Sequence, residues 1–308
     1  MKIEEVLVLG AGAMGREIAL QCAMFGYRTT VYDTNREALA NARAIVDLIV
    51  PTLAGTYVQD TAAAIKSRIY YTLDLEEAAA GADLISENVP EDPQIKGRAL
   101  ARVHPLAPPH AIFATNSSSL TPSQFAEMTG RPERLLAMHF HKTVWVSNVV
   151  DIMPHAGTAP GLADILAGFA RSIRQIPIVL REESQGYTFN SLLHAYQSQA
   201  LSLWTRGLVS FENIDRAWMV AERASHGPFG AMDFMGLDTV YAVTNYWAVA
   251  ENHALALAAA KKLKTEFVDR GRLGVKSGAG FYSYPDPAFS DPRFLDPSSL
   301  GADAPAAS

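Results

Sequence analysis

Two histidines and a lysine lie close together in LLAMHFHKTVW, residues 135–145. The imidazole of histidine titrates near neutral pH, so it is suited to take a proton from a hydroxyl group as a general base. Asp151 lies 12 positions after His139, in the next apolar run. Two paired strands would bring this acid to the ring, where it can orient the imidazole and stabilise its protonated form.

The neighbouring polar residues of this segment allow other chemistry. His141 lies two positions after His139, and this spacing in a strand places both side chains on one face. The pair is an alternative metal site, but no cysteine or closely spaced acid completes it, and we predict no metal. Lys142 adds a positive charge that either faces solvent or contacts a substrate.

The elements that would hold these residues are short apolar strands alternating with helices. This pattern is typical of a parallel sheet buried on both faces. It predicts an α/β domain with a doubly wound, Rossmann-type parallel sheet over residues 1–182, with a helical insertion at about 35–67 in which Pro51 and Gly55 separate two helical patterns. The expected strands are residues 6–9, 29–32, 68–72, 82–86, 111–115, 135–140, 148–153 and 176–180.

The strand pattern stops at about residue 183. Helical periodicity over 191–207, 213–224 and 238–264 predicts an all-α C-terminal domain spanning 183–308, which would bind substrate and form a homodimer. The stretch after Tyr284 is rich in proline, aspartate, serine and alanine, so we expect it to fray.

Composition limits the classes of partner. The formal net charge is -6 and the chain has no cationic block, which argues against nucleic acid and membrane surfaces as partners. No apolar run reaches the roughly 18 residues of a transmembrane helix. The single cysteine, Cys22, cannot form an intramolecular disulfide and falls in an apolar helical pattern. These features predict a protein of the reducing cytoplasm.

A glycine motif, GAGAMG, occupies residues 10–15 between a predicted strand and a predicted helix. In this context the first glycine allows a tight turn, the second lets the backbone approach a pyrophosphate, and the third permits close packing of helix on strand. The helix N-terminus adds amide donors and partial positive charge. We therefore expect a dinucleotide cofactor in contact with Gly10, Gly12, Met14 and Gly15.

The acid after the second strand favours one dinucleotide. Asp33 lies 18 positions after Gly15, where a carboxylate can accept hydrogen bonds from a ribose 2′-hydroxyl and would repel a 2′-phosphate. The sequence therefore predicts NAD, although the nearby Arg36 keeps NADP open as an alternative.

With these motifs the sequence resembles the 3-hydroxyacyl-CoA dehydrogenase family over nearly its whole length. The helical insertion also fits this family, whereas β-hydroxyacid dehydrogenases of the phosphogluconate type lack it and use a catalytic lysine that QGYTFNSLLH does not contain. The matching segments are GAGAMG with Asp33, ENVPEDPQIK (87–96), ATNSSSL (114–120), the His139 segment, QGYTFN (185–190), GPFGAMDFMGLDT (227–239) and GVKSGAGFY (274–282).

The resemblance implies roles for individual residues. His139 would be the general base, with Asp151 where the family has a glutamate, and Ser118 and Asn190 would bind the reacting oxygen of the substrate. The nicotinamide end of the cofactor would contact Glu91, Lys96 and Asn116, and Lys264 is a weaker match to a family lysine near the cofactor.

The histidine segment departs from the family pattern of histidine, two apolar residues, asparagine and proline. Lys142 replaces the asparagine and Thr143 the proline. Asp151 is one methylene shorter than glutamate, so backbone position or a bridging water must recover its distance to His139.

The resemblance implies an NAD-dependent oxidoreductase that interconverts an (S)-3-hydroxyacyl thioester and its 3-keto form. One alternative is oxidation of a free hydroxy acid, because sugar-acid and carnitine dehydrogenases share the architecture; Lys142 would repel the quaternary ammonium of carnitine. Another is a cofactor-binding protein without catalysis, as in some lens crystallins, against which the retention of Ser118, His139 and Asn190 argues.

Overall fold

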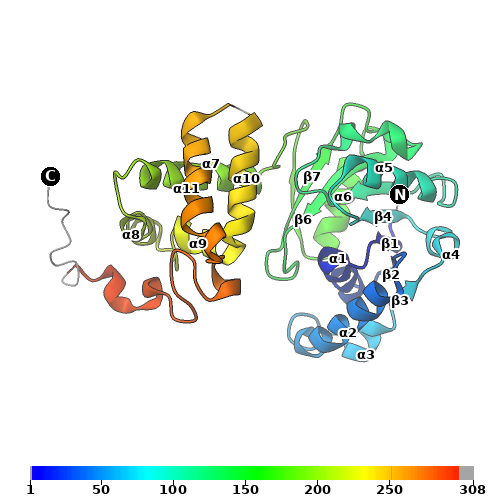
Figure 1. Cartoon of the computed structure of the whole chain (residues 1–308). Helices are drawn as coiled ribbons and strands as arrows, with labels where there is room; N and C mark the ends of the chain where they lie inside the picture. Colours follow the sequence, from blue (N-terminus) through cyan, green and yellow to red (C-terminus); the bar gives the residue numbers. More distant parts are fainter. Residues whose placement is uncertain (1, 251, 298–308) are drawn as a thin grey trace. The chain divides into compact units, whose positions relative to one another are not determined.

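The structure of the chain, a computed structural model, describes residues 2–250 and 252–297. It contains two compact units, one ending at Asn190 and one beginning at Ser191 (Figure 1). The boundary that the sequence predicts, at residues 182 and 183, lies in the segment between the last strand and the first helix of the second unit.

The first unit is built on an eight-stranded sheet in the order β3-β2-β1-β4-β5-β6-β7-β8. The chain starts in the middle of the sheet, winds to one edge through β3, returns beside β1 with β4, and then winds to the other edge. Each predicted strand is present, shifted by at most two residues. The strands are β1 (Glu5–Leu9), β2 (Arg28–Tyr32), β3 (Ile69–Thr72), β4 (Leu84–Glu87), β5 (Ile112–Thr115), β6 (Leu135–Phe140), β7 (Val149–Pro154) and β8 (Ile176–Val179).

Helices cover both faces of this sheet. Apolar residues of α1, α2 and α6 share one core with the sheet, and those of α4 and α5 share a second core on the other face. The doubly wound Rossmann-type architecture is therefore confirmed. The helices are α1 (Ala13–Met24), α2 (Arg36–Leu53), α3 (Ala62–Lys66), α4 (Leu75–Ala79), α5 (Pro93–Val103) and α6 (Leu162–Ser172).

The expectation of a wholly parallel sheet is wrong at one edge. β7 pairs antiparallel with β6, and β8 is parallel to β7, so these two strands oppose the other six. Only residues 141–148 connect β6 to β7, too few for the crossover that a parallel pair needs. This hairpin places residues near the C-terminal end of β6 directly beside the start of β7.

The predicted helical insertion is present, but Pro51 does not separate its helices. α2 continues through Pro51 to Leu53, and the amide of Ala54 closes its last turn by donating to the carbonyl of Val50. Proline removes one backbone donor and crowds the carbonyl four residues earlier, and here it lies in the last turn of α2, where little helix remains to be disrupted. The break between α2 and α3 follows, in a turn that contains Gly55 at a positive φ of 77°.

The described residues of the second unit contain helices and no β-strand, which confirms the all-α prediction. One expected helical stretch, 238–264, forms two helices that lie side by side, because Asn252 takes a positive φ of 51° and His253 caps the next helix. The helices are α7 (Phe189–Thr205), which starts in the first unit, α8 (Phe211–Glu222), α9 (Pro228–Met235), α10 (Leu237–Ala250) and α11 (Ala254–Glu266).

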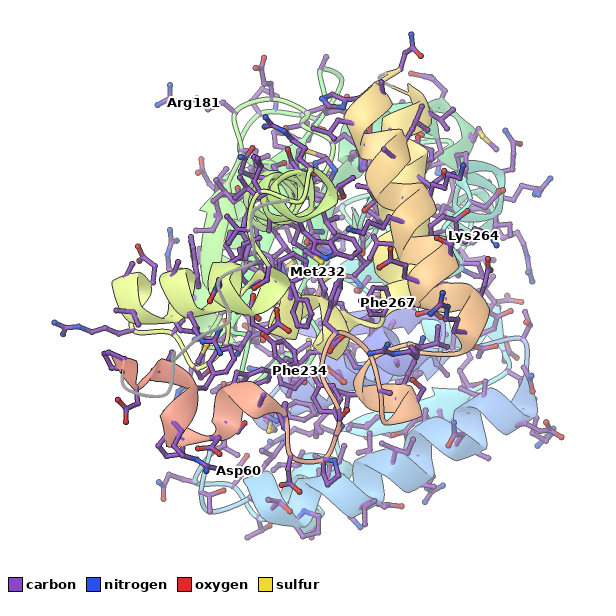
Figure 2. All side chains as sticks on the ribbon, turned by 60° about the vertical axis from the view of Figure 1, so that its left-hand side comes forward. Asp60, Arg181, Met232, Phe234, Lys264 and Phe267 are labelled. Carbon is purple, nitrogen blue, oxygen red and sulfur yellow. The ribbon has the colours of Figure 1, made fainter. Side chains whose placement is uncertain are left out.

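The core of the second unit is rich in aromatic and large apolar side chains, among them Met232 and Phe267, both buried (Figure 2). Phe289 and Phe294 belong to the same core. The prediction that the chain frays after Tyr284 is therefore wrong up to residue 297, since two 3₁₀ turns hold these phenylalanines in place. Residues 298–308 lie outside the described part.

Candidate active site

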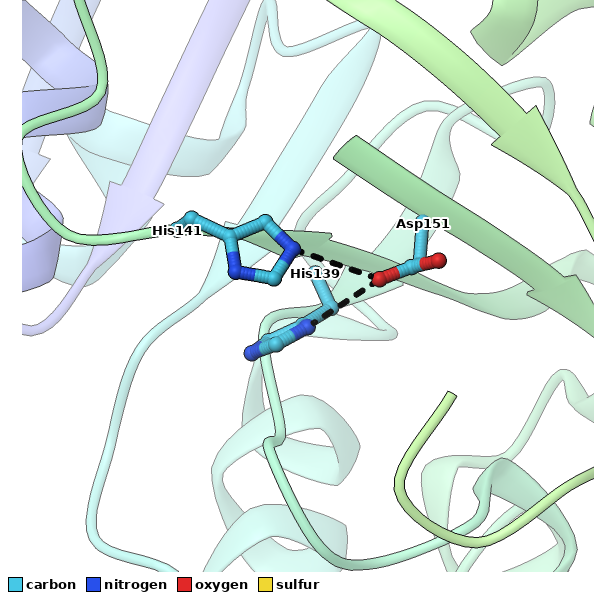
Figure 3. A group of neighbouring side chains, drawn as sticks. All are labelled: His139, His141 and Asp151. Atoms are coloured by element: carbon cyan, nitrogen blue, oxygen red, sulfur yellow. Dashed lines mark hydrogen bonds and ion pairs between the residues drawn. The ribbon is translucent and has the colours of Figure 1, made fainter. Parts of the chain in front are cut away.

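The β6–β7 hairpin brings His139 and Asp151 together. The two residues are directly opposite each other in the antiparallel register, and Nδ1 of His139 lies 3.7 Å from Oδ2 of Asp151 (Figure 3). This distance is longer than a hydrogen bond but within reach of a charged pair. Both side chains are almost fully buried, with 5% and 1% of their surface exposed.

The opposite edge of the His139 ring faces a serine. Nε2 lies 3.2 Å from the hydroxyl oxygen of Ser118, on the loop that follows β5. The ring also stacks on Tyr187, with ring centroids 4.7 Å apart and an angle of 18° between the planes. The sequence reasoning missed Tyr187, although it lies within the quoted QGYTFN segment. The stack fixes the ring plane, so Nε2 points to Ser118 while Nδ1 points to Asp151.

Asp151 is held in its ionised form despite its burial. Burial alone would raise the pKa of this carboxyl group, but the imidazoles of His139 and His141 and the amide of Thr188 hold the pKa well below its usual range. A carboxylate at this position favours a proton on the near nitrogen of His139 and leaves the lone pair on Nε2.

His141 lies beside the same carboxylate. Its Nε2 is 3.4 Å from Oδ2 of Asp151, and its ring meets the His139 ring edge-on at 4.9 Å between centroids. His141 lies one residue beyond the end of β6, outside the expected strand, but both histidines lie beside Asp151. The statement that no closely spaced acid completes a metal site is wrong, because the hairpin supplies Asp151 from the adjacent strand.

A carboxylate organises the loop that carries Ser118. One oxygen of Glu91, Oε1, accepts hydrogen bonds from the amides of Ser118 and Ser119, at 2.9 and 2.8 Å, and from the hydroxyls of Ser117 and Ser119, at 2.6 and 2.9 Å. Burial would raise the pKa of Glu91, but these donors and the ammonium of Lys96 lower it to about 2. Glu91 therefore positions Ser118 through the backbone of its loop.

Lys96 is buried beneath this loop and joins two acids. Its ammonium contacts Glu87 at 3.0 Å and Glu91 at 3.2 Å, and donates to the carbonyl of Val89 at 3.1 Å. Glu87 also accepts the hydroxyl proton of Thr115 at 2.6 Å. Sequence reasoning assigned no role to Glu87, although this acid opens the quoted segment ENVPEDPQIK directly after the predicted strand 82–86. Because the donors of Lys96 have these partners, the lysine braces the ends of β4 and β5.

Asn116 links the ends of two strands near His139. Its side-chain oxygen accepts the amide of Phe140 at 2.7 Å, so β5 and β6 stay in register beside His139. Asn190 is half-buried at the second position of α7. Phe189, immediately before it, meets the His141 ring at 5.2 Å between centroids, so this end of α7 lies near the histidine pair.

The loop after β6 has an anchor of its own. The carboxylate of Glu17 on α1 accepts the amides of Thr143 and Val144, at 2.7 and 3.2 Å. Thr143 takes a positive φ of 61°, which the proline of the family pattern cannot adopt. The side chain of Lys142 is exposed on this loop.

Comparison with known proteins identifies the chain. The model of the 3-hydroxyacyl-CoA dehydrogenase NAD binding domain matches residues 5–183, and the model of the C-terminal domain of the same enzymes matches residues 186–284. The chain belongs to the 3-hydroxyacyl-CoA dehydrogenase family. It is an oxidoreductase that acts on a CH–OH group with NAD as cofactor.

Individual relatives cover most of the chain. The human mitochondrial hydroxyacyl-coenzyme A dehydrogenase is 28% identical over 92% of this chain and 91% of its own. A Mesorhizobium japonicum 5-formyl-3-hydroxy-2-methylpyridine 4-carboxylate 5-dehydrogenase is 26% identical over 92% and 91%. A solved structure described as substrate-directed dual catalysis of dicarbonyl compounds by diketoreductase has a TM-score of 0.85 and 35% identity, over 92% of this chain and all of its own.

The glycine loop of this family member fits a dinucleotide. Gly10 takes φ 98°, and a Cβ there would lie 2.7 Å from the carbonyl oxygen of Asn88; a Cβ on Gly15 would lie 1.9 Å from the carbonyl oxygen of Gly10. A Cβ on Gly12 would meet nothing within 4 Å, and Gly12 begins α1 without a side-chain cap. The helix amides thus lie open for a pyrophosphate.

The remaining residues predicted for NAD lie at different depths. Asp33 accepts the amide of Ala11 at 2.8 Å and that of Asn35 at 2.9 Å, so it shapes the glycine loop at the end of β2. Met14 is half-buried against the core. Lys264, in the second unit, is paired with Asp269 on the surface.

Among the described residues, no helix of this dehydrogenase is both long and apolar enough to cross a membrane.

Proposed function

We propose that this family member oxidises an (S)-3-hydroxyacyl thioester to its 3-keto form, and reduces the keto form in the reverse direction, with His139 as the base. The position of His139 carries the proposal: Nε2 lies 3.2 Å from the hydroxyl of Ser118 while Nδ1 faces Asp151. A ring held between an acid and a hydroxyl is the arrangement needed for proton transfer from an alcohol.

The proton moves through one ring in this mechanism. Neutral His139 carries its proton on Nδ1, next to Asp151, and uses the Nε2 lone pair to take the hydroxyl proton of the substrate. Ser118 and Asn190 would hold the reacting oxygen at Nε2. NAD, when bound, supplies the hydride acceptor. Asp151 then stabilises the imidazolium from a distance of 3.7 Å. Its position directly opposite His139 in the strand pair makes up for a side chain one methylene shorter than the family's glutamate.

Several residues serve positioning in this proposal. Glu91 holds the amides of the Ser118 loop, and Lys96 fixes Glu91 to the end of β4. Tyr187 keeps the imidazole plane. None of the three needs to touch the reacting atoms, yet each sets the distance between Nε2 and the bound oxygen, to which proton transfer is sensitive.

A second candidate substrate class is a free hydroxy acid or a dicarbonyl compound. Lys142 favours it, because this exposed cation replaces a neutral asparagine three residues after the base and can pair with a carboxylate. The names of two relatives support it, one a dehydrogenase of a pyridine carboxylate and the other a diketoreductase described with dicarbonyl compounds. A cofactor-binding protein without turnover is the third reading.

The deciding experiment measures NADH oxidation with acetoacetyl-CoA, longer 3-ketoacyl-CoAs and the matching free 3-keto acids. The thioester proposal expects kcat/KM for at least one CoA ester to exceed that of its free acid by tenfold or more. A preference for the free acid would replace it with the second candidate. Absence of turnover on every compound, with NADH still bound, would leave only the cofactor-binding reading.

We also propose that the helical unit forms a homodimer and that the protein works in the cytoplasm. Several large apolar side chains are exposed on its helices, which is unusual for a surface that faces water alone. They include Leu192, Trp218, Val220, Val243, Tyr246 and Val249. Analytical ultracentrifugation tests the proposal, and a monomer at micromolar concentration contradicts it.

A further inference from the structure

We propose that His139, His141 and Asp151 form a binding site for a late first-row divalent cation such as Zn²⁺, and that the bound ion switches off the base. Each of the three residues offers one ligand atom, and these atoms all lie within 4.8 Å of one another. Nδ1 of His139 and Nε2 of His141 are the nitrogens nearest to Oδ2 of Asp151. The two contacts to Oδ2 measure 3.7 and 3.4 Å, and Figure 3 shows both rings directed at this oxygen. Ligand atoms about 2.0–2.2 Å from a tetrahedral zinc ion lie at about such separations from one another.

The donor set suits this class of ion. Two neutral imidazoles and one carboxylate are typical of Zn²⁺ and its neighbours, whereas Mg²⁺ and Ca²⁺ prefer oxygen ligands. In the part of the chain that the structure describes, Nδ1 of His139 makes no hydrogen bond although it is buried. A buried nitrogen that makes no hydrogen bond is costly, and a metal ion bound between this nitrogen and Asp151 would satisfy it.

The site arises from this chain's departure from the family pattern. His141 stands where the pattern has an apolar residue, and without it only one nitrogen and one carboxylate would remain. Its side chain is the most exposed of the three ligands, at 15%, against 5% for His139 and 1% for Asp151. An ion can therefore enter from the His141 side.

Inhibition follows from the chemistry of the imidazole. A metal ion on Nδ1 takes that nitrogen's lone pair, so the proton of the neutral ring must move to Nε2. Nε2 then donates to the Ser118 hydroxyl and has no lone pair with which to take a substrate proton. The ring stays neutral, but Nε2 can no longer accept a proton. This step rests on the proposed role of His139 as base, whereas the binding site itself does not.

Inhibition by Zn²⁺ could not be explained by ion binding to a thiol. Cys22 is the only cysteine of the chain. It is fully buried, and burial raises its pKa to about 12, so it supplies no thiolate to an ion in solution near neutral pH. Zn²⁺ sensitivity that depends on His141 would therefore report on the histidine cluster.

The test uses the full chain freed of metal with EDTA. Co²⁺ is added and its visible absorption recorded without substrate, and Zn²⁺ is titrated against turnover. We expect one Co²⁺ per chain, inhibition by Zn²⁺ that EDTA reverses, and a half-inhibitory concentration that rises at least about tenfold in His141→Phe and in His141→Gln, each compared with its own metal-free rate. His110→Gln is the matched control, since His110 pairs with Asp83 at 2.9 Å elsewhere in the same unit.

The Co²⁺ binding and Zn²⁺ inhibition measurements test the site and the switch separately. No Co²⁺ bound at about 100 µM, or a His141→Phe protein as sensitive as the wild type, overturns the site. Binding that depends on His141 but leaves turnover unchanged overturns the switch and counts against His139 as base. Thermal unfolding of the metal-free variants shows whether they fold; should His141→Phe fail, His141→Gln carries the comparison.

Discussion

Replacing Glu91 by glutamine tests whether the Ser118 loop is held by charge. The carboxylate accepts four hydrogen bonds on Oε1 and pairs with Lys96 on Oε2. A pKa lowered from 4.5 to about 2 corresponds to about 3 kcal/mol of preference for the charged form. Because 38% of the side chain is exposed, solvent screening reduces this to about 1–2 kcal/mol. Glutamine keeps one acceptor but turns an amide donor toward the lysine.

We therefore expect Glu91→Gln to lower the free energy of unfolding by about 1–2 kcal/mol at pH 7. The folded pKa is below the unfolded one, so the stabilisation is complete above pH 4.5 and is lost as the pH falls toward 2. Because the unfolded chain takes up a proton at Glu91 before the folded one does, the difference in free energy of unfolding between wild type and variant should shrink by about 0.8 kcal/mol between pH 7 and pH 4. Urea unfolding followed by circular dichroism at both pH values measures it.

The same variant should lower kcat/KM by tenfold or more, since Ser118 moves with its loop. Glu183→Gln is the matched control, because among the described residues that carboxylate accepts one hydrogen bond, from the amide of Ser123. Equal unfolding free energies for wild type and Glu91→Gln at pH 7 would refute the charge argument. A lowered stability with unchanged turnover would show that the loop does not position a catalytic group.

Three further predictions concern His139, the choice of cofactor and Lys142. His139→Gln should lower turnover on the order of 10²–10⁴-fold with NADH binding intact in a fluorescence titration, and near-wild-type rates would show that another group is the base. NADH should exceed NADPH in kcat/KM, and Asp33→Ser should narrow that gap; equal use of both by the wild type contradicts the role of Asp33. Lys142→Asn should lower kcat/KM on the true substrate by more than tenfold, about 1.4 kcal/mol, with the loss confined to free acids if those are the substrates. Unchanged rates on every compound would place Lys142 in solvent.

The sequence predicted those features that depend on local pattern. The strands were found because a strand buried on both faces is a short apolar run, and the glycine loop because its residues are adjacent. The direction of β7 was missed, although the eight residues between β6 and β7 exclude a crossover. The break of the last helical stretch at Asn252 also escaped, because a positive φ at a non-glycine residue leaves little trace in composition.

Apart from the pair of His139 and Asp151, the partners of the site residues could not be predicted, because they depend on contacts distant in sequence. Glu17 reaches the amide of Thr143 across 126 positions, and neither residue falls in a motif that names the other. Glu87 directly follows the predicted strand 82–86, but only the fold shows that it pairs with Lys96, which in turn pairs with Glu91, the acid that binds the Ser118 loop. A buried acid is informative only once its cation is known.

The departures from the family pattern are concentrated in one place. The glycine loop and Asp33 follow the pattern, and the Glu91 network that supports Ser118 lies within the matching segments. His141, Lys142, Thr143 and Asp151 differ from it, and all four belong to the hairpin formed by β6 and β7. The residues proposed to contact NAD and those proposed to contact the substrate therefore lie on different structural elements. Changes in the hairpin would alter the surroundings of the proposed base and the charge on its loop while the residues proposed to hold NAD stay in place, so we expect this chain to differ from its relatives in substrate and in response to ions rather than in cofactor.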